Sequence, residues 1–204
     1  ITTYNHEKYI RQCLMSIFEQ NFSGTYEIVI GNDNSSDQTE AIIQNIMAEH
    51  PLGSRIVYLK NNPNIGYVKN TLRTFEEAKG KYIAVLDGDD YWTDDFKIQK
   101  QFNLLEKDKN LSAVGTNSKV IYEDADIQSH SYNNLPERIL KKENLTEISV
   151  FQTSTLFFRK NILKSDFPTD IISADRCLYL LAGCYGDVKF LAEETSVYRQ
   201  FRAS

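Results

Sequence analysis

An apolar run ends directly at a group of carboxylates in the sequence Lys81-Tyr82-Ile83-Ala84-Val85-Leu86-Asp87-Gly88-Asp89-Asp90. The run from Tyr82 to Leu86 is typical of a buried strand. Carboxylates that gather at a strand end repel one another unless a cation binds between them. Gly88 permits the tight backbone that lets them converge. We therefore expect Asp87 and Asp89 to form a divalent-metal site, and a metal at a strand end suggests an enzyme.

Strand and helix patterns alternate on the amino-terminal side of this sequence. Apolar helical stripes lie in residues 10–18, 42–47 and 68–78, with Gly80 as the expected cap of the third helix. Buried-strand patterns lie at 27–31 and 56–59. This alternation predicts an α/β fold with a mostly parallel sheet and helices on both faces. Ile1-Thr2-Thr3 resembles the end of another strand, so we expect the full protein to start earlier, and a targeting segment or anchor can lie outside the sequence.

The carboxyl-terminal side is less regular. Asp94 and Asp95 are expected to be charges at the start of a helix over residues 96–106. The other expected elements are strands at 112–116, 155–158, 188–191 and 196–198, and a helix at 175–183. Residues 124–147 are polar without a clear period, which predicts a long loop or a short helix that shapes a binding site. No linker or repeat divides the chain, so residues 1–204 are expected to form a single domain.

The composition narrows the class of protein. The 204 residues are 41% hydrophobic, as in a folded domain with its own core, and the net charge of −5 argues against general nucleic-acid binding. The three cysteines lack a CxxC spacing, which favours reduced thiols in a cytosolic protein. No apolar run approaches the roughly 20 residues that a membrane-spanning helix needs. The GxSxG, P-loop and GxGxxG motifs are absent, which weakens the hydrolase, nucleoside triphosphatase and Rossmann dehydrogenase hypotheses.

Three predicted strand ends carry polar residues: Thr2–Asn5, Asn32–Thr39 and Asp87–Asp90. Ligands of open parallel sheets bind beyond the carboxyl ends of the strands. A pocket at these three ends suits a nucleotide, with Tyr4 beside the base, Asp33 hydrogen-bonded to base or ribose, and the metal at the diphosphate. The alternatives are a packed Tyr4, a solvated acidic turn, and helix caps in 33–39, where Asp37 is the expected cap.

Asp175 precedes the last predicted helix and allows two interpretations. It is either a charge that favours the helix amino terminus or a general base that accepts a proton from a substrate hydroxyl. The residue pattern alone leaves both open.

These motifs together resemble the family 2 glycosyltransferases, which are inverting enzymes with the Rossmann-like GT-A fold. Asn32–Thr39 is similar to the family's Asp-Asp-Gly-Ser-x-Asp-x-Thr motif, and residues 64–70 are similar to its Asn-x-Gly-x-x-x-Arg-Asn segment. Gly80–Asp90 resembles the strand and DXD motif. Thr2–Asn5 resembles the family's opening, and Tyr198-Arg199 matches a Tyr-Arg near the domain end.

The resemblance implies roles for particular residues. The nucleoside would be held by Thr2, Tyr4, Glu7 and Asp33, and Lys69 would approach the nucleotide. Asp89 would bind Mg²⁺ or Mn²⁺, with Asp87 and Gly88 at the ribose, diphosphate or metal. Asp175 would be the catalytic base. Residues 1–123 would form the nucleotide-sugar half of the domain and residues 124–204 the acceptor half.

The sequence departs from the family pattern at four positions. Asn32 replaces the first Asp of its motif, and the second is retained as Asp33. Ala174 replaces the usual Glu before the catalytic Asp, Arg176 stands where Trp often follows, and Phe201 stands where His is common.

The expected function is inverting transfer of a sugar from a nucleotide-diphosphate sugar, a UDP-sugar, to an acceptor hydroxyl in polysaccharide, lipopolysaccharide or capsule biosynthesis. The acceptor would be a saccharide or a lipid-linked molecule. The expected location is the cytoplasm, at the inner face of the cytoplasmic membrane. The alternatives are a metal-dependent nucleotidyltransferase and a non-catalytic nucleotide-sugar-binding protein.

Overall fold

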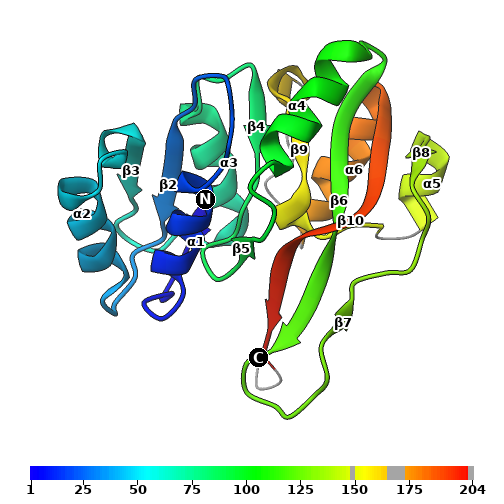
Figure 1. Cartoon of the computed structure of the whole chain (residues 1–204). Helices are drawn as coiled ribbons and strands as arrows, with labels where there is room; N and C mark the ends of the chain where they lie inside the picture. Colours follow the sequence, from blue (N-terminus) through cyan, green and yellow to red (C-terminus); the bar gives the residue numbers. More distant parts are fainter. Residues whose placement is uncertain (148–149, 165–172, 202–204) are drawn as a thin grey trace.

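The computed structural model describes residues 1–147, 150–164 and 173–201. Its first sheet has the order β1-β2-β3, from Thr2–Thr3, Ile28–Asn32 and Ile56–Lys60, and its strands are parallel as expected. All five residues of β2 are buried, which is why this strand is a continuous apolar run in the sequence. This sheet forms the left part of Figure 1.

The second sheet is mixed. Its main path runs β4-β9-β6-β10-β5, from Tyr82–Ala84, Phe157–Arg159, Leu111–Tyr122, Asp187–Gln200 and Tyr91–Trp92. β6 and β10 are parallel, and the other pairs on this path are antiparallel. The strands expected at 188–191 and 196–198 form one strand, β10, and the strand expected at 112–116 is the longer β6. Figure 1 shows that the carboxyl-terminal halves of β6 and β10 extend below the rest of the sheet.

Helices cover both faces of the sheets, as the alternating pattern predicts. The six α-helices of the described residues are α1 (Ile10–Phe18), α2 (Thr39–Glu49), α3 (Tyr67–Glu77), α4 (Lys97–Lys107), α5 (Lys142–Glu147) and α6 (Ala174–Tyr185). One hydrophobic cluster joins α1, α2 and α4 through residues such as Leu14, Ile43 and Leu105. A second cluster joins α3, α5 and α6, with Phe75 and Leu178 among its members. The two clusters are the two sides of the layered α/β fold.

Two expectations about local structure need correction. α3 ends at Glu77, and Ala78 is already extended, so Gly80 lies beyond the helix and does not cap it. The segment 124–147 contains the short helix α5, one of the two expected alternatives, but it also contains β7 (His130–Ser131) and β8 (Arg138–Leu140), which were not expected. β7 pairs with β6 and β8 pairs with β10, so sheet pairing fixes a segment that shows no period of its own.

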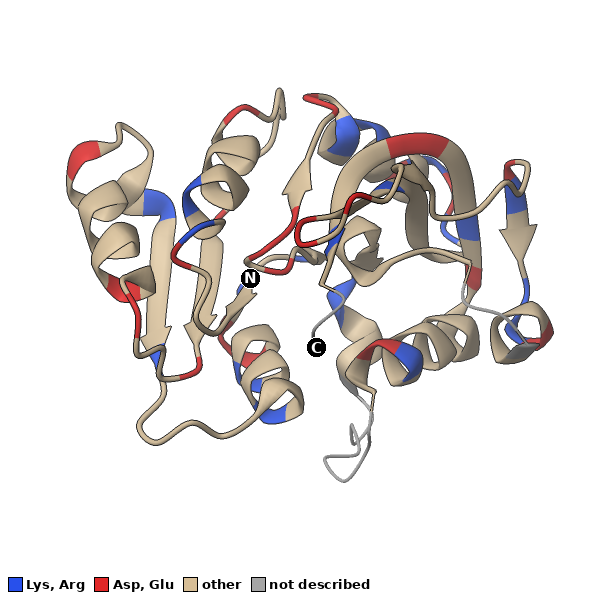
Figure 2. Cartoon of the chain, turned by 90° about the horizontal axis from the view of Figure 1, so that it is seen from below, with Lys and Arg blue, Asp and Glu red and all other residues tan. Residues whose placement is uncertain are grey.

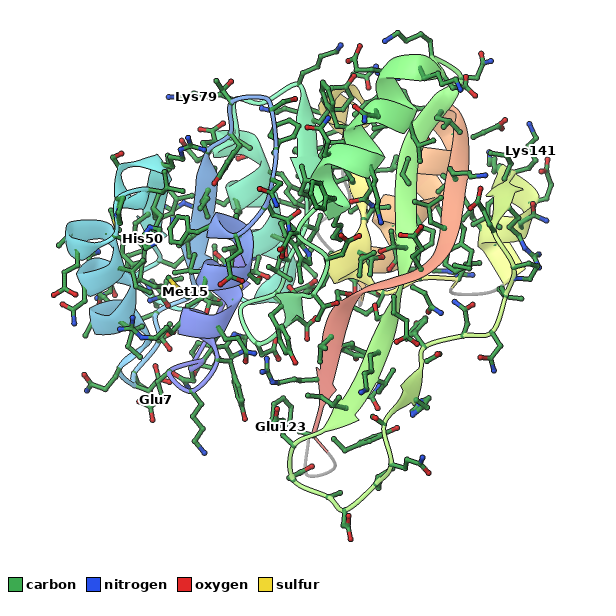
Figure 3. All side chains as sticks on the ribbon, in the orientation of Figure 1. Glu7, Met15, His50, Lys79, Glu123 and Lys141 are labelled. Carbon is green, nitrogen blue, oxygen red and sulfur yellow. The ribbon has the colours of Figure 1, made fainter. Side chains whose placement is uncertain are left out.

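The two sheets meet where β1 reaches the turn after β4. An isolated parallel bridge joins Thr2 to Asp87, and the Gly88 N–H donates to the Thr2 carbonyl at 2.9 Å. Glu7 and Glu123 lie at the same lower end of the molecule, and Lys79 lies at the opposite end (Figure 3). The predicted polar strand ends therefore meet at one edge of the fold, as the parallel topology requires.

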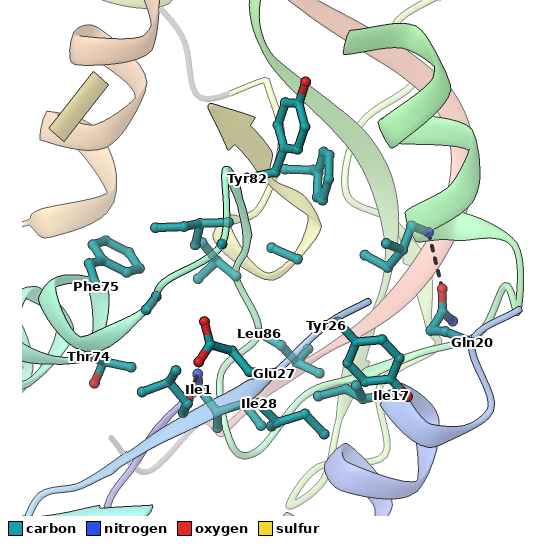
Figure 4. Close-up of a pocket in the computed structure, with 18 of the residues that line it drawn as sticks. Ile1, Ile17, Gln20, Tyr26, Glu27, Ile28, Thr74, Phe75, Tyr82 and Leu86 are labelled. Atoms are coloured by element: carbon teal, nitrogen blue, oxygen red, sulfur yellow. Dashed lines mark hydrogen bonds between the residues drawn. The ribbon is translucent and has the colours of Figure 1, made fainter. Parts of the chain in front are cut away.

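An apolar cavity of about 850 Å³ lies on the other side of this junction. Ile28 and Ile83 are among the residues that line it. Figure 4 shows apolar side chains around this space, with Ile1 at its edge. The Ile1 backbone nitrogen donates to the Val29 carbonyl at 2.7 Å. Thr2 and Tyr67, which donate to Asp87 and Asp175, are among its lining residues, so the cavity adjoins the carboxylate cluster.

Within the described residues, no helix combines the length and the apolar character needed to cross a bilayer. The three cysteines, Cys13, Cys177 and Cys184, are free thiols.

Candidate functional site

Asp87 lies at the centre of the carboxylate cluster. Its Oδ1 accepts a hydrogen bond from the Thr2 hydroxyl at 2.7 Å, and its N–H donates to Ser154 Oγ at 3.1 Å. Burial of the carboxylate, with the charges of Asp175 and Asp89 nearby, raises the pKa of Asp87 to about 7. Ionisation of Asp87 is therefore unfavourable in the metal-free protein, and a bound cation would offset its free-energy cost.

The raised pKa of Asp87 predicts a pH-dependent stability of the metal-free protein. Between the ordinary value of 3.8 and about 7 the folded state binds more protons at this group than the unfolded state, so raising the pH lowers the free energy of unfolding. Asp87→Asn keeps the acceptor for Thr2 but removes the charge. In EDTA, we expect this variant to match the wild type at pH 4 and to exceed it by about 3 kcal/mol at pH 8.

Urea denaturation at both pH values measures this difference. The exposed Asp95→Asn serves as the control, because it removes a carboxylate outside the buried cluster. A constant difference between Asp87→Asn and the wild type from pH 4 to pH 8 would contradict the prediction.

Asp90 is a structural anchor, a role that its position in the sequence does not reveal. It is 1% exposed, its Oδ2 accepts from the Ser154 hydroxyl at 2.6 Å, and its Oδ1 accepts from the Arg199 N–H at 2.9 Å. The Arg199 guanidinium donates to the Asp89 carbonyl, to Glu123 Oε1 at 2.6 Å and to the Gln12 side chain. β10 and the turn at Ser154 thereby hold the backbone of the aspartate turn from two sides.

Arg199 also lies between two aromatic rings. Its guanidinium carbon is 4.8 Å from the ring centroids of both Tyr9 and Tyr91. Stacking on aromatic faces and several hydrogen bonds suit the planar guanidinium, which a lysine cannot replace. The side chain is fixed at a point where α1, β5 and the aspartate turn meet.

Removing the Asp90 carboxylate should destabilise the protein. Asp90→Ala leaves the Ser154 hydroxyl and the Arg199 N–H without their acceptor in a buried place, and each unsatisfied group costs about 1–3 kcal/mol. We expect the free energy of unfolding, measured in urea, to fall by about 3 kcal/mol, with no change in Asp95→Ala. A loss below about 1 kcal/mol would show that Asp90 does not anchor the turn.

The Ser154 turn has its own support beneath it. The Trp92 indole N–H donates to the Ser154 carbonyl at 2.8 Å, and the Lys97 ammonium donates to the Thr155 carbonyl at 3.1 Å and to Gln101 Oε1 at 2.7 Å. Lys97 is fully buried, and this burial lowers its pKa to about 7. These contacts hold the turn that contacts both Asp87 and Asp90.

Asp89 differs from its neighbours because its carboxylate is less engaged. Its Oδ2 is 3.8 Å from His6 Nε2, and the pKa of His6 is lowered by burial, which favours the neutral imidazole. No group of three or more His, Cys, Asp or Glu in the described part of the chain has a metal-binding arrangement. Mg²⁺ is commonly held by one or two carboxylates, with water and substrate phosphates completing its shell. Asp87 and Asp89 fit that kind of site.

Gly88 is required by close packing. A Cβ atom at this position would lie 2.8 Å from both Thr3 Oγ1 and His6 Nδ1. The backbone of Gly88 thus passes directly against the end of β1. Seen from below in Figure 2, acidic segments gather beside the amino terminus near the middle of the molecule.

Asp33 is 3% exposed and organises the loop before α3. Its Oδ1 accepts from the Asn61 side chain and the Ile65 N–H, both at 2.8 Å, and its Oδ2 accepts from the Gly66 N–H at 2.8 Å. Gly66 has a φ of +86°, which favours glycine. The structure therefore gives Asp33 a role in holding residues 61–66, which the sequence did not indicate.

The other predicted nucleoside residues surround this edge. Tyr4 is 48% exposed after β1, and Lys69 is exposed on α3. Glu7 Oε2 accepts from the Gln38 N–H at 2.9 Å, and the Glu7 N–H donates to Asp37 Oδ2 at 3.0 Å. Asp37 Oδ1 also accepts from the Thr39 N–H at 3.0 Å, so Asp37 satisfies a donor at the start of α2. The N-cap residue itself is Gln38, one position after the expected cap Asp37.

Asp175 reaches the cluster from the opposite half of the chain. It is the second residue of α6, whose amino terminus is capped by Ser173, which accepts from the Arg176 N–H at 3.2 Å. The Tyr67 hydroxyl donates to Asp175 Oδ1 at 2.8 Å. The charge of Asp175 is among the causes that raise the pKa of Asp87, which brings the candidate base and the candidate metal ligand into one site.

Sequence reasoning missed Tyr67, Ser154 and the anchoring role of Asp90. Tyr67 directly follows the glycine of the Asn64-Ile65-Gly66 turn, but nothing in the sequence indicates its distant partner. Ser154 lies in a 3-10 turn, Thr153–Thr155, where a strand was expected to begin. In the sequence, Arg199 is marked only by the Tyr198-Arg199 motif. Its contacts depend on the register of β10.

The family model described as Glycosyl transferase family 2 matches residues 1–167. This match includes the aspartate turn and ends before Asp175. An uncharacterized Mycobacterium tuberculosis protein is 30% identical over 198 residues, which are 97% of this chain and 57% of that protein. The chain thus spans little more than half the length of this curated relative.

Two solved structures share the fold. TarS 1–349 from S. aureus in complex with UDP superposes with a TM-score of 0.76 at 21% identity, covering 98% of this chain and 59% of that chain. The mannosyltransferase PcManGT from Pyrobaculum calidifontis, in complex with GDP-Man and Mn²⁺, gives a TM-score of 0.69 at 16% identity, covering 98% and 55%. These two structures confirm the α/β fold that the sequence predicts. The first sheet of this chain is parallel, as expected.

Proposed function

Because the chain belongs to glycosyl transferase family 2, we propose that its site transfers a sugar from a nucleoside-diphosphate sugar to an acceptor hydroxyl. The observation that carries this proposal is the convergence of Asp87 and Asp175, which are 88 residues apart in the sequence, with Thr2 and Tyr67 as their hydrogen-bond donors. Asp87 lies after a strand, in a position suited to bind a cation. Asp175 lies at the start of α6, in a position suited to a general base.

The proposed donor is a UDP-sugar. Thr2, Tyr4, Glu7, Asp33 and Lys69 would surround the nucleoside at the carboxyl ends of β1 and β2. Support comes from the position of these residues at one edge of the sheet and from the UDP in the TarS complex. Residues 1–123 would contribute the donor side, and residues 124–204 the acceptor side, of a single GT-A domain.

Mg²⁺ or Mn²⁺ would be held by Asp87 and Asp89, together with oxygen atoms of the donor diphosphate. A divalent cation at this place supplies Lewis-acid stabilisation of a diphosphate leaving group. The complex of PcManGT with GDP-Man and Mn²⁺ supports this assignment for the fold. Asp90 takes no part in it, because Ser154 and Arg199 occupy its oxygens.

The reaction would proceed by a single displacement with inversion. Asp175 accepts the proton of the acceptor hydroxyl, whose oxygen bonds to the anomeric carbon while the bond from that carbon to the diphosphate oxygen breaks. A single displacement forms no glycosyl-enzyme intermediate, so one base is sufficient. The acceptor would be a saccharide or a lipid-linked molecule in polysaccharide, lipopolysaccharide or capsule synthesis, at the cytoplasmic face of a membrane.

Thermal-shift assays test the donor first. UDP-, GDP- and CMP-sugars are added with and without Mn²⁺, and a metal-dependent rise in Tm with UDP-sugars supports the proposal. Product analysis then distinguishes the alternatives. Release of nucleoside diphosphate with a glycosylated acceptor supports transfer, release of pyrophosphate from a nucleoside triphosphate indicates a nucleotidyltransferase, and binding without any turnover indicates a binding protein.

A further inference from the structure

Tyr67 joins the two halves of the proposed site. It is the first residue of α3, and its hydroxyl donates to Asp175 Oδ1 at 2.8 Å across a sequence distance of 108 residues. Burial and the charges of Asp87 and Asp175 raise the pKa of Tyr67, so the phenol keeps its proton and acts as the donor. The residue is nevertheless 42% exposed, which makes it accessible at the edge of the site.

The position of Tyr67 is fixed from the donor side. The Asp33 carboxylate accepts the N–H groups of Ile65 and Gly66, the two residues immediately before Tyr67. The Tyr67 carbonyl accepts from the Thr71 hydroxyl at 2.9 Å within α3. The phenol thus projects from a backbone that a buried carboxylate holds in place.

Asp175 needs such a partner because it lies near other carboxylates. Its charge and that of Asp87 disfavour each other, and a hydrogen bond to an ionised carboxylate stabilises the ionised form. Among the described residues, the side-chain hydrogen bond to Asp175 comes from Tyr67 and occupies Oδ1. Within the described part of the chain, Oδ2 accepts no hydrogen bond that competes with a substrate hydroxyl.

We propose that Tyr67 is a positioning residue for the base, one that holds Oδ1 of Asp175 so that Oδ2 accepts the proton of the acceptor hydroxyl. This inference rests on the proposed function, because it assigns Tyr67 a role only if Asp175 is the base. It adds a residue from the donor side of the domain to the chemistry on the acceptor side. One hydrogen bond, from Tyr67 to Asp175, thus connects the two sides of the proposed site.

Tyr67→Phe tests the inference because it removes the hydroxyl and keeps the ring. We expect kcat to fall about 10- to 100-fold at neutral pH, since a hydrogen bond to a charged group is lost. The acidic limb of the pH–rate profile should move to higher pH, and the KM for the donor should stay within about twofold. Tyr185→Phe, an exposed tyrosine on the helix of Asp175, should have no effect.

A double-mutant cycle separates the inference from the proposed function. If Tyr67 acts through Asp175, Tyr67→Phe should cause no further loss in the Asp175→Asn background. An equal loss in both backgrounds, or an unmoved pH–rate profile in the single variant, would overturn the positioning role. If Asp175→Asn itself keeps full turnover, the proposed base is wrong, whatever Tyr67→Phe does.

Discussion

Asp175→Asn is expected to lower kcat by about 10²- to 10⁴-fold, the contribution typical of a general base. Asparagine has nearly the same shape and can still accept the hydrogen bond from Tyr67, so the fold and the donor site should be retained. The affinity for the nucleotide sugar, measured by calorimetry, should therefore change by less than about threefold. The loss appears in kcat because proton removal occurs only in the transition state.

An exposed carboxylate elsewhere in the chain provides the control for this experiment. Asp95→Asn removes an exposed carboxylate and should leave turnover unchanged. Circular dichroism and Tm of both variants should match the wild type, which excludes misfolding as the cause of the loss. Turnover of Asp175→Asn equal to that of the wild type would reject Asp175 as the base.

Asp89→Ala should abolish metal-dependent nucleotide binding. The Asp89 carboxylate is the least engaged of the three in the turn, with His6 Nε2 at 3.8 Å, so it is the most available of them to bind a cation. Removing a metal ligand should weaken the affinity for the nucleoside diphosphate in Mn²⁺ by more than about 100-fold. Calorimetry of the same titration in EDTA should show little difference between the variant and the wild type.

A nucleoside without phosphates provides the matched control for Asp89→Ala. Its binding needs no cation, so its affinity should be the same in the variant and the wild type. The backbone carbonyl of Asp89, which accepts from Arg199, is retained in the alanine variant, and the turn should therefore keep its shape. Normal affinity of the variant for the diphosphate in Mn²⁺ would reject the assignment of Asp89.

The part of the fold that follows local patterns was predictable from the sequence. β2 and α4 appear as an apolar run and an apolar stripe because each packs one continuous surface against the core. β10 was expected as two strands, since Glu193 and Glu194 interrupt its apolar pattern. The structure keeps it as one strand with register shifts against β6 at Leu191/Glu194 and Glu194/Ser196. Polar residues at such irregularities cannot be distinguished from a turn by composition.

The candidate site shows the same division. The position of Asp87 and Asp89 at one edge of a sheet could be predicted because they directly follow an apolar strand pattern. The sequence assigns no role to Asp90, and only the approach of Ser154 and Arg199 gives it one. The Tyr67–Asp175 hydrogen bond likewise depends on how α3 and α6 pack, and a short motif contains no information about that contact.

The hydrogen bond from the Arg199 N–H to Asp90 has a consequence for the order of folding. The two residues are 109 positions apart, so the aspartate turn is completed by a strand near the end of the described chain. Contacts of such long sequence separation form slowly, because a large loop must close first. During synthesis, the amino-terminal half emerges with its carboxylates before either Ser154 or Arg199 exists. The aspartate turn therefore gains its full set of hydrogen bonds only after β10 has been synthesised and has paired with β6.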